Sequence, residues 1–210
     1  MRIDASHISK KFGKQSIIRD FSHSFLPREK YVITGANGSG KSTLLKMLSG
    51  YLSPDSGTVT FSHMGDASTD PTIKNELVST SLNEQKSPDI SIYAPYIAPP
   101  NDLTVSEAIR FHAQFKPLRK NEQDLLELVQ LNPSKKLTEL SSGMKQRLQL
   151  AFVFFSKSEV LFLDEPTSFF DTTWKAVYHQ WLNTLCENRT IILSSNDENE
   201  YVGFGNIIRL

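Results

Sequence analysis

Residues 35–43 read GANGSGKST, a combination of residue types that can hold the phosphates of a nucleotide. Glycines adopt positive φ at little cost, so those at positions 35, 38 and 40 let backbone N–H groups turn inward around phosphate oxygens. Lys41 places a cation on the β- and γ-phosphates, and the Ser42 hydroxyl provides one ligand for a bridging Mg²⁺. The candidate nucleotide-binding residues of this loop are Gly35, Asn37, Gly38, Ser39, Gly40, Lys41, Ser42 and Thr43.

The residues on either side of the loop support this interpretation. An apolar run at 31–34 precedes it and an apolar, helix-like run at 44–48 follows it, as in a strand–P-loop–helix unit of the GxxxxGKS type. The alternative is a glycine-rich turn that matches the pattern by accident. A strand and a helix in the right places favour nucleotide binding.

Two adjacent carboxylates, Asp164 and Glu165, follow the continuous apolar run Val160–Leu163. Such a run is typical of a parallel strand that is buried on both faces, and sites in open α/β sheets lie at the carboxyl ends of strands. Asp164 can hold Mg²⁺ through water, while Glu165 can orient and deprotonate an attacking water. Two solvated carboxylates in a turn are the alternative, which the P-loop in the same chain disfavours.

The elements that must position these residues follow from the hydrophobic pattern. Strands are expected over residues 2–8, 17–25, 31–34, 58–61, around 92–94 before Pro95, 160–163, 190–194 and 206–210, and the first ones form an antiparallel flap. Helices are expected after the P-loop as far as Ser49, from Thr104 with a capping box to Glu107, over 122–131, from Ser141 or Ser142 to about Ser156, and over 174–185. Residues 62–91 are expected to be mostly loop or short edge strands. The fold class is α/β with a mostly parallel sheet.

Composition limits the function. With 210 residues and 39% hydrophobic content, the chain can bury one sizeable core. The 23 basic residues balance 23 acidic ones, which argues against nucleic acid as a partner without excluding a local basic patch. A single cysteine, Cys186, is compatible with a reducing cytosol. No run of about 18 apolar residues could span a bilayer, so any membrane role requires a partner.

A third motif is Leu-Ser-Ser-Gly-Met-Lys-Gln-Arg at residues 140–147. Ser141, Ser142 and Gly143 open a helix, so hydroxyls and free N–H groups form a second anion site. With the P-loop and the acid pair, the motif resembles the ATP-binding subunit of an ABC transporter over essentially the whole chain. Ser142 stands where the family's LSGGQ signature has its first glycine.

The resemblance implies a fold, a site and partners. It implies a P-loop NTPase core with an antiparallel β flap, a single domain over residues 1–210 and a helical signature subdomain at about 100–156. It also implies a second copy or a similar subunit whose signature contacts the γ-phosphate, so that ATP lies between two protomers. Phe12 would stack on adenine, although an ordinary packed aromatic is the local alternative, and Asp171 would contact the other protomer. The helical insert would dock on a polytopic membrane permease, which places the protein at the cytoplasmic face of the membrane.

Two positions depart from the family pattern. Tyr96 replaces the glutamine that senses Mg²⁺, and Asn196 replaces the switch histidine. A tyrosine hydroxyl can still reach the water shell of the metal, and an asparagine can donate to the γ-phosphate but cannot carry a positive charge. The predicted catalytic residues are Glu165, Lys41 and Asn196, and the predicted metal residues are Ser42, Asp164 and Tyr96.

These observations predict an ATPase that powers a separate permease. An ATP-gated dimerisation switch with weak hydrolysis is the alternative that the two departures suggest. A soluble ABC protein acting on DNA or ribosomes is a third, disfavoured by the neutral charge and the lack of a long heptad run.

Overall fold

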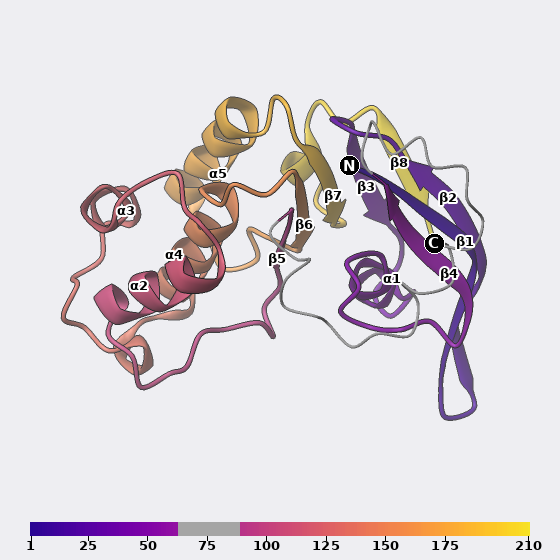
Figure 1. The fold of residues 1–210 in the computed structure, drawn as a ribbon, viewed down its shortest axis with the longest axis horizontal. Coiled ribbons are helices and arrows are strands. Elements are labelled where there is room, and N and C mark those ends of the chain that lie inside the picture. Colours follow the sequence, from indigo (N-terminus) through magenta and orange to yellow (C-terminus); the bar gives the residue numbers. More distant parts are fainter. Residues whose placement is uncertain (63–88) are drawn as a thin grey trace.

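In a computed structural model, residues 1–62 and 89–210 are described, and they form two sheets (Figure 1). The antiparallel sheet has the order β2-β1-β4, and the parallel sheet has the order β5-β6-β7-β3-β8. The antiparallel strands are β1 (Arg2–Phe12), β2 (Gln15–Phe25) and β4 (Ser56–Ser62). The parallel strands are β3 (Lys30–Thr34), β5 (Ile90–Tyr93), β6 (Val160–Asp164), β7 (Thr190–Ser194) and β8 (Asn206–Arg209). The expected α/β class with an antiparallel flap is confirmed.

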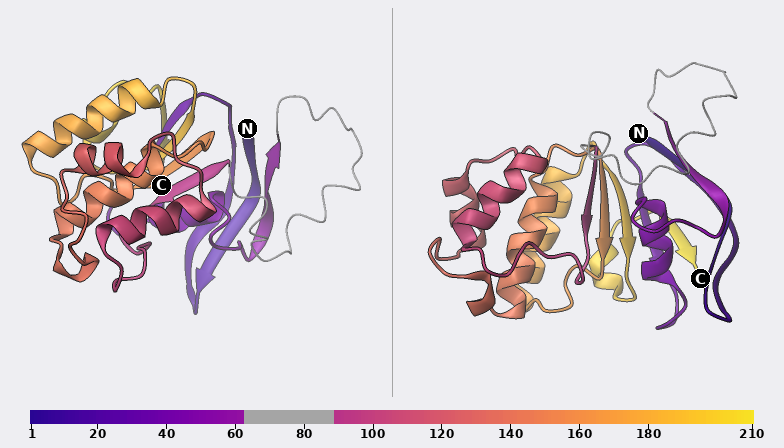
Figure 2. Two further views of the ribbon diagram at one scale, coloured as in Figure 1. Left: turned by 60° about the vertical axis from the view of Figure 1, so that its left-hand side comes forward. Right: turned by 60° about the horizontal axis from the view of Figure 1, so that its bottom comes forward.

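Helices cover both faces of the parallel sheet. They are α1 (Lys41–Leu48), α2 (Val105–Phe115), α3 (Glu122–Val129), α4 (Ser142–Phe154) and α5 (Thr172–Leu185), with short 3₁₀ turns η3 (Leu137–Glu139) and η4 (Glu198–Tyr201). Helix α1 lies between the two sheets, while α2 to α5 gather on the opposite side of the parallel sheet (Figures 1 and 2). None of these helices is long and apolar enough to span a bilayer, within the part of the chain that is described.

Alternation along the parallel strands creates two separate cores. On β6, Val160 and Phe162 pack in the core that contains α1 and the antiparallel sheet, whereas Leu161 and Leu163 pack in the core that contains α2 to α5. Successive side chains of a strand point to opposite faces, so an unbroken apolar run fills both. This burial fixes the strand that ends at Asp164.

The structure differs from expectation in the length of the first hairpin. The strands were expected over residues 2–8 and 17–25, but β1 runs to Phe12 and β2 starts at Gln15. The added residues are mostly polar and carry no hydrophobic alternation that a sequence pattern could detect. The pairing of β1 with β2 also passes through register shifts, and His7 and Asp20 adopt φ of 52° and 48° there.

Helix limits in the insert follow local backbone chemistry. The capping box before α2 is present, with Thr104 Oγ1 accepting from Glu107 N and Glu107 Oε2 accepting from Thr104 N. Helix α3 ends at Val129 rather than at Leu131, because Gln130 adopts a left-handed conformation with φ of 54°. Most of the expected loop at 62–91 lies outside the described residues, although Ile90 and Ser91 belong to β5.

Candidate active site

The loop between β3 and α1 has the backbone that its glycines predict. Gly35, Gly38 and Gly40 have φ of 153°, 83° and 103°. A Cβ on Gly40 would lie 2.7 Å from Ile17 Cγ2 of β2, so the flap packs closely against the loop. Lys41 is 5% exposed, and its Nζ donates to the carbonyl oxygens of Gly35 at 2.8 Å and Ala36 at 3.3 Å.

Several donors of the loop fit an anion. The first-turn N–H groups of α1 have no partner within the helix, and the helix dipole favours negative charge at this end. The buried Ser39 Oγ has no hydrogen-bond partner among the described residues. Thr43 lies in the same first turn and is half-buried. These groups can receive phosphate oxygens.

Ser42 and Asp164 meet beside the loop. The Ser42 hydroxyl donates to Asp164 Oδ1 at 3.0 Å, although the two residues come from α1 and β6. Burial raises the pKa of Asp164, and the hydrogen bond from Ser42 opposes that rise. A hydroxyl and a carboxylate in contact are oxygen ligands of the kind that Mg²⁺ takes, with water and phosphate completing its shell. The residues therefore fit the ion.

Tyr96 also lies near Asp164. It follows β5 and is 42% exposed, with Lys46 Nζ 3.7 Å from the centroid of its ring. Burial raises the pKa of Tyr96, and Asp164 raises it further through charge and a hydrogen bond. The structure thus brings all three predicted metal residues together.

Glu165 and Asn196 line one pocket of about 430 Å³ together with Asn37 of the P-loop. Glu165 is exposed and has φ of 47°, and its N–H donates to Ser194 O at 2.9 Å. A non-glycine residue holds such a conformation only where its surroundings fix it. The turn therefore directs the carboxylate into the space beside the P-loop.

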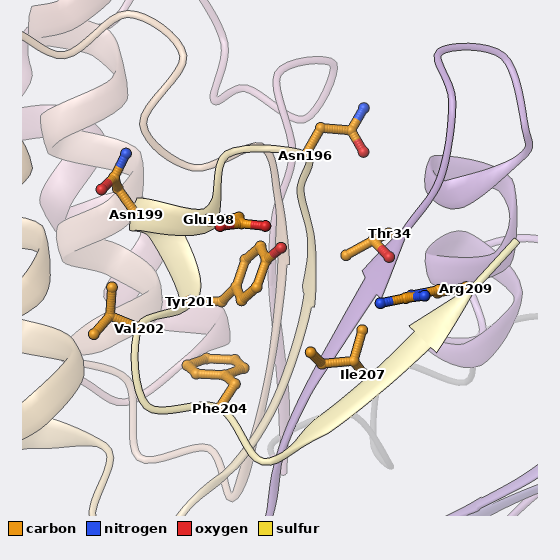
Figure 3. Close-up of a pocket in the computed structure, with 9 residues that line it drawn as sticks. All are labelled: Thr34, Asn196, Glu198, Asn199, Tyr201, Val202, Phe204, Ile207 and Arg209. Carbon is orange, nitrogen blue, oxygen red and sulfur yellow. The ribbon is translucent and has the colours of Figure 1, made fainter.

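The side-chain amide of Asn196 connects the end of β7 to the P-loop. Its Oδ1 accepts from Gly35 N at 3.3 Å, and its Nδ2 donates to Asn37 Oδ1 at 3.2 Å. Asn196 also lies at the edge of a second pocket, of about 630 Å³, between η4 and β8 (Figure 3). Tyr201 and Phe204 present aromatic rings in that pocket, away from the P-loop.

The signature residues lie elsewhere. Ser141 caps α4, its Oγ accepting from Met144 N at 3.3 Å, and Ser141 and Ser142 are exposed. Gly143 packs on Phe169, where a Cβ would lie 3.1 Å from the carbonyl oxygen. Because α4 and α1 are on opposite sides of the parallel sheet, the structure does not bring the signature to the P-loop of its own chain (Figure 1).

The two remaining predicted contacts have clear local settings. Phe12 is 52% exposed at the end of β1, with Lys10 Nζ 5.9 Å from its ring centroid, so the alternative of an ordinary packed aromatic is wrong. Asp171 is exposed and caps α5, its Oδ1 accepting from Trp174 N at 2.9 Å. Stacking on a base and contact with another protomer stay predictions.

Two buried polar residues beside the site had no role in the sequence analysis. Glu200 Oε1 accepts from Thr167 N at 2.9 Å and from Thr167 Oγ1 at 2.5 Å. Gln146 forms hydrogen bonds with Pro166 O and Phe169 N, in the same turn as Thr167. The sequence contains one sign that Gln146 is buried. It lies four residues before the apolar Leu150 in a helix, and residues four apart share a helix face.

Comparison with known proteins agrees with this geometry. The family model described as ABC transporter matches residues 18–168. The uncharacterized ABC transporter ATP-binding protein YybJ of Bacillus subtilis is 29% identical over 212 residues, covering 98% of this chain and 90% of YybJ. The sulfate/thiosulfate import ATP-binding protein CysA 2 of Rhizobium meliloti is 29% identical over 95% of this chain, but the match spans 54% of CysA 2. The Nod factor export ATP-binding protein I of Burkholderia lata is 30% identical over 92% of this chain and 62% of its own length.

Solved structures share the fold. A putative ABC transporter ATP-binding protein from Pyrococcus furiosus superimposes with a TM-score of 0.74 at 23% identity, covering 100% of this chain and 98% of that one. The ATP-binding cassette MJ0796, in a dimeric post-hydrolysis state bound to ADP and Pi, gives a TM-score of 0.79 at 20% identity, covering 99% and 94%. With a family match over the P-loop, the signature and the acid pair, this chain belongs to the ABC transporter family, as one of its ATP-hydrolysing cassettes.

Proposed function

We propose that two copies of this cassette, or one copy and a similar ATPase subunit, hold ATP between them and drive a separate polytopic membrane permease. One observation carries the proposal. Asp164, Glu165 and Asn196 lie beside the P-loop that carries Lys41 and Ser42. The exposed signature serines, in contrast, open a helix on the other side of the parallel sheet. The signature is thus available to a nucleotide held by another protomer.

Each residue has a role in in-line attack of water on the γ-phosphate. Lys41 exchanges its two carbonyl contacts for phosphate oxygens and neutralises their developing charge. Glu165 orients the water and takes its proton. The Asn196 amide donates to the γ-phosphate from its place beside Asn37. Mg²⁺ held by Ser42, and by Asp164 through water, would supply further charge on the β- and γ-oxygens.

The test starts from Glu165→Gln. We expect this variant to bind ATP and form a dimer of twice the 23.7 kDa chain mass while its turnover falls. Adding Ser142→Trp, at an exposed position, should abolish the ATP-dependent dimer and leave the affinity of the monomer for ATP unchanged. Light scattering measures the mass and nucleotide fluorescence measures the affinity. Parent turnover by Glu165→Gln would exclude Glu165 as the base.

A permease partner would place the protein at the cytoplasmic face of the membrane. CysA 2 is named for import and the Nod factor protein for export, so the relatives do not indicate one direction of transport. Co-purification of the intact chain with a polytopic membrane protein is the expected result. Salt-sensitive binding to nucleic acid would favour the non-transport alternative instead.

An ATP-gated switch with weak hydrolysis is the second candidate, because Asn196 carries no charge and Tyr96 is held by Lys46. Slow turnover from these two positions stays a prediction. Phosphate release by the purified dimer, before and after Asn196→His, tests it. A brisk parent rate that the substitution does not change would exclude the switch.

A further inference from the structure

We infer that Gln146 is a positioning residue for hydrolysis, which fixes the turn of Glu165 to the signature helix of the same chain. Gln146 lies in α4 and is 2% exposed. Its Nε2 donates to Tyr93 Oη at 2.9 Å and to Pro166 O at 2.8 Å, and its Oε1 accepts from Phe169 N at 3.1 Å. The side-chain amide therefore bonds three residues, one at the end of β5 and two in the turn that follows Asp164.

Each of the three partners of Gln146 lies close in sequence to a predicted residue of the site. Pro166 directly follows Glu165, and Tyr93 ends β5 three residues before Tyr96. Phe169 precedes the α5 cap at Asp171 by two residues. Gln146 is three residues beyond Gly143 and is the fifth residue of α4. One buried amide thus joins the signature helix to the turn at residues 165–169, hereafter the acid turn, and to the segment that leads to Tyr96. Through Phe169 it also reaches the segment that leads to Asp171.

A second contact joins the same parts independently. Gly143 packs against the carbonyl of Phe169 so closely that a Cβ would lie 3.1 Å from it. The start of α4 and the chain after Glu165 are therefore in contact through backbone as well as through Gln146. Because close-packed interiors transmit displacements, a shift at the start of α4 should also move the turn that follows Glu165.

The Glu165 conformation explains why this link matters. Its φ of 47° is costly for a residue with a Cβ and persists only where the surroundings hold it. Without Gln146, the Pro166 carbonyl and the Phe169 N–H lose their partners, and the turn can relax. A shift of about 1 Å in a catalytic group can reduce a rate by about 10²-fold. The inference rests on the proposed function, in which Glu165 is the base and the signature meets a nucleotide of the other protomer.

The experiment compares two glutamines of the same helix. Gln146→Met removes all three hydrogen bonds. Gln149→Met is the matched control, because Gln149 Nε2 donates to Ile97 O at 2.8 Å, directly after Tyr96, and this hydrogen bond does not reach the acid turn. The control therefore separates the support of the acid turn from the support of the segment that carries Tyr96. We expect Gln146→Met to lower kcat by about 10- to 100-fold with the KM for ATP within about 3-fold of the parent, and Gln149→Met to change neither.

Hydrogen exchange gives a readout that does not depend on activity. Peptides covering residues 165–171 should exchange faster in Gln146→Met than in Gln149→Met, while peptides from α1 exchange equally in both. Gln146→Glu, which keeps the Phe169 acceptor but turns an oxygen toward Pro166 O, should reproduce the loss in kcat. That variant also serves as the test if the methionine variant aggregates.

Combination with Glu165→Gln separates positioning from general damage. If Gln146 acts through Glu165, Gln146→Met should not reduce the residual rate of Glu165→Gln further. An additive loss, or equal kcat and equal exchange in the two methionine variants, would overturn the inference. Parent turnover by Glu165→Gln alone would instead refute the proposed base, and the exchange comparison would still decide whether Gln146 fixes the turn.

Discussion

Glu200 also binds the acid turn, through Thr167, and we expect it to stabilise the fold and to support the rate of hydrolysis. Glu200 is 4% exposed, and its Oε1 receives two hydrogen bonds from Thr167, which is 2% exposed and lies two residues after Glu165. Glu200→Ala leaves the buried N–H and hydroxyl of Thr167 without an acceptor. Hydrogen bonds to a charged group contribute about 1.5–3 kcal/mol each, so the loss of both should lower the free energy of unfolding by about 3–6 kcal/mol.

Two further variants work as controls. Glu200→Gln keeps an acceptor oxygen for Thr167 but removes the negative charge of the buried carboxylate. The second oxygen of that carboxylate, Oε2, has no hydrogen-bond partner among the described residues. A weaker acceptor lowers the free energy of unfolding, whereas loss of the buried charge raises it, so the net change should stay below about 2 kcal/mol. Thr167→Val removes only the hydroxyl bond and should cost about 1–2 kcal/mol.

Urea denaturation measures the unfolding free energies, and steady-state phosphate release measures the rates. The parent should be the most stable and Glu200→Ala the least stable, with Glu200→Gln and Thr167→Val between them, and kcat should fall in the same order. If Glu200→Gln were as unstable as Glu200→Ala, the charge and not the acceptor would hold the turn. A loss below about 1 kcal/mol in Glu200→Ala would refute the reasoning altogether.

Three other outcomes follow from the structure. Asp164→Asn should abolish the strengthening of ATP binding by Mg²⁺, measured by calorimetry with and without the ion, because the amide removes the charge beside Ser42. Burial, and secondarily the charge of Lys116, lowers the pKa of His112 to about 4, so the unfolded chain binds the additional proton between about pH 4 and pH 6.5. The free energy of unfolding should therefore fall as pH is lowered through that range, and the fall should be smaller in His112→Leu. Burial raises the pKa of the Cys186 thiol to about 12, so it should resist alkylation at pH 8 until the protein is denatured.

The parts of the site that sequence could predict are those whose chemistry restricts residue type locally. Lys41 and Ser42 stand at fixed offsets from glycines that the loop backbone requires. Asp164 and Glu165 are marked by the buried strand that precedes them. Such patterns are readable because each residue's neighbours in sequence are also its neighbours in the structure.

The hydrogen bonds that hold the site could not be predicted, because their partners are distant in the chain. Gln146 and Pro166 are separated by 20 residues, and Thr167 and Glu200 by 33. A buried polar side chain is recognisable in sequence as an exception on an apolar face, but the pattern does not name its partner. The hairpin was underestimated for a related reason, since exposed strands such as the end of β1 have little apolar period to detect.

The position of the sheet explains why complete motifs in one chain need not make one complete site. On β6, Phe162 belongs to the core with α1, and Leu163 belongs to the core with α4. Secondary-structure layers pack about 10 Å apart, so roughly two layers separate a P-loop helix on one face from a signature helix on the other. A serine side chain cannot cross that thickness. If Ser141 and Ser142 contact a γ-phosphate, that phosphate must therefore be held by the P-loop of a second protomer. The Ser142→Trp variant tests this requirement directly, because it should abolish the ATP-dependent dimer.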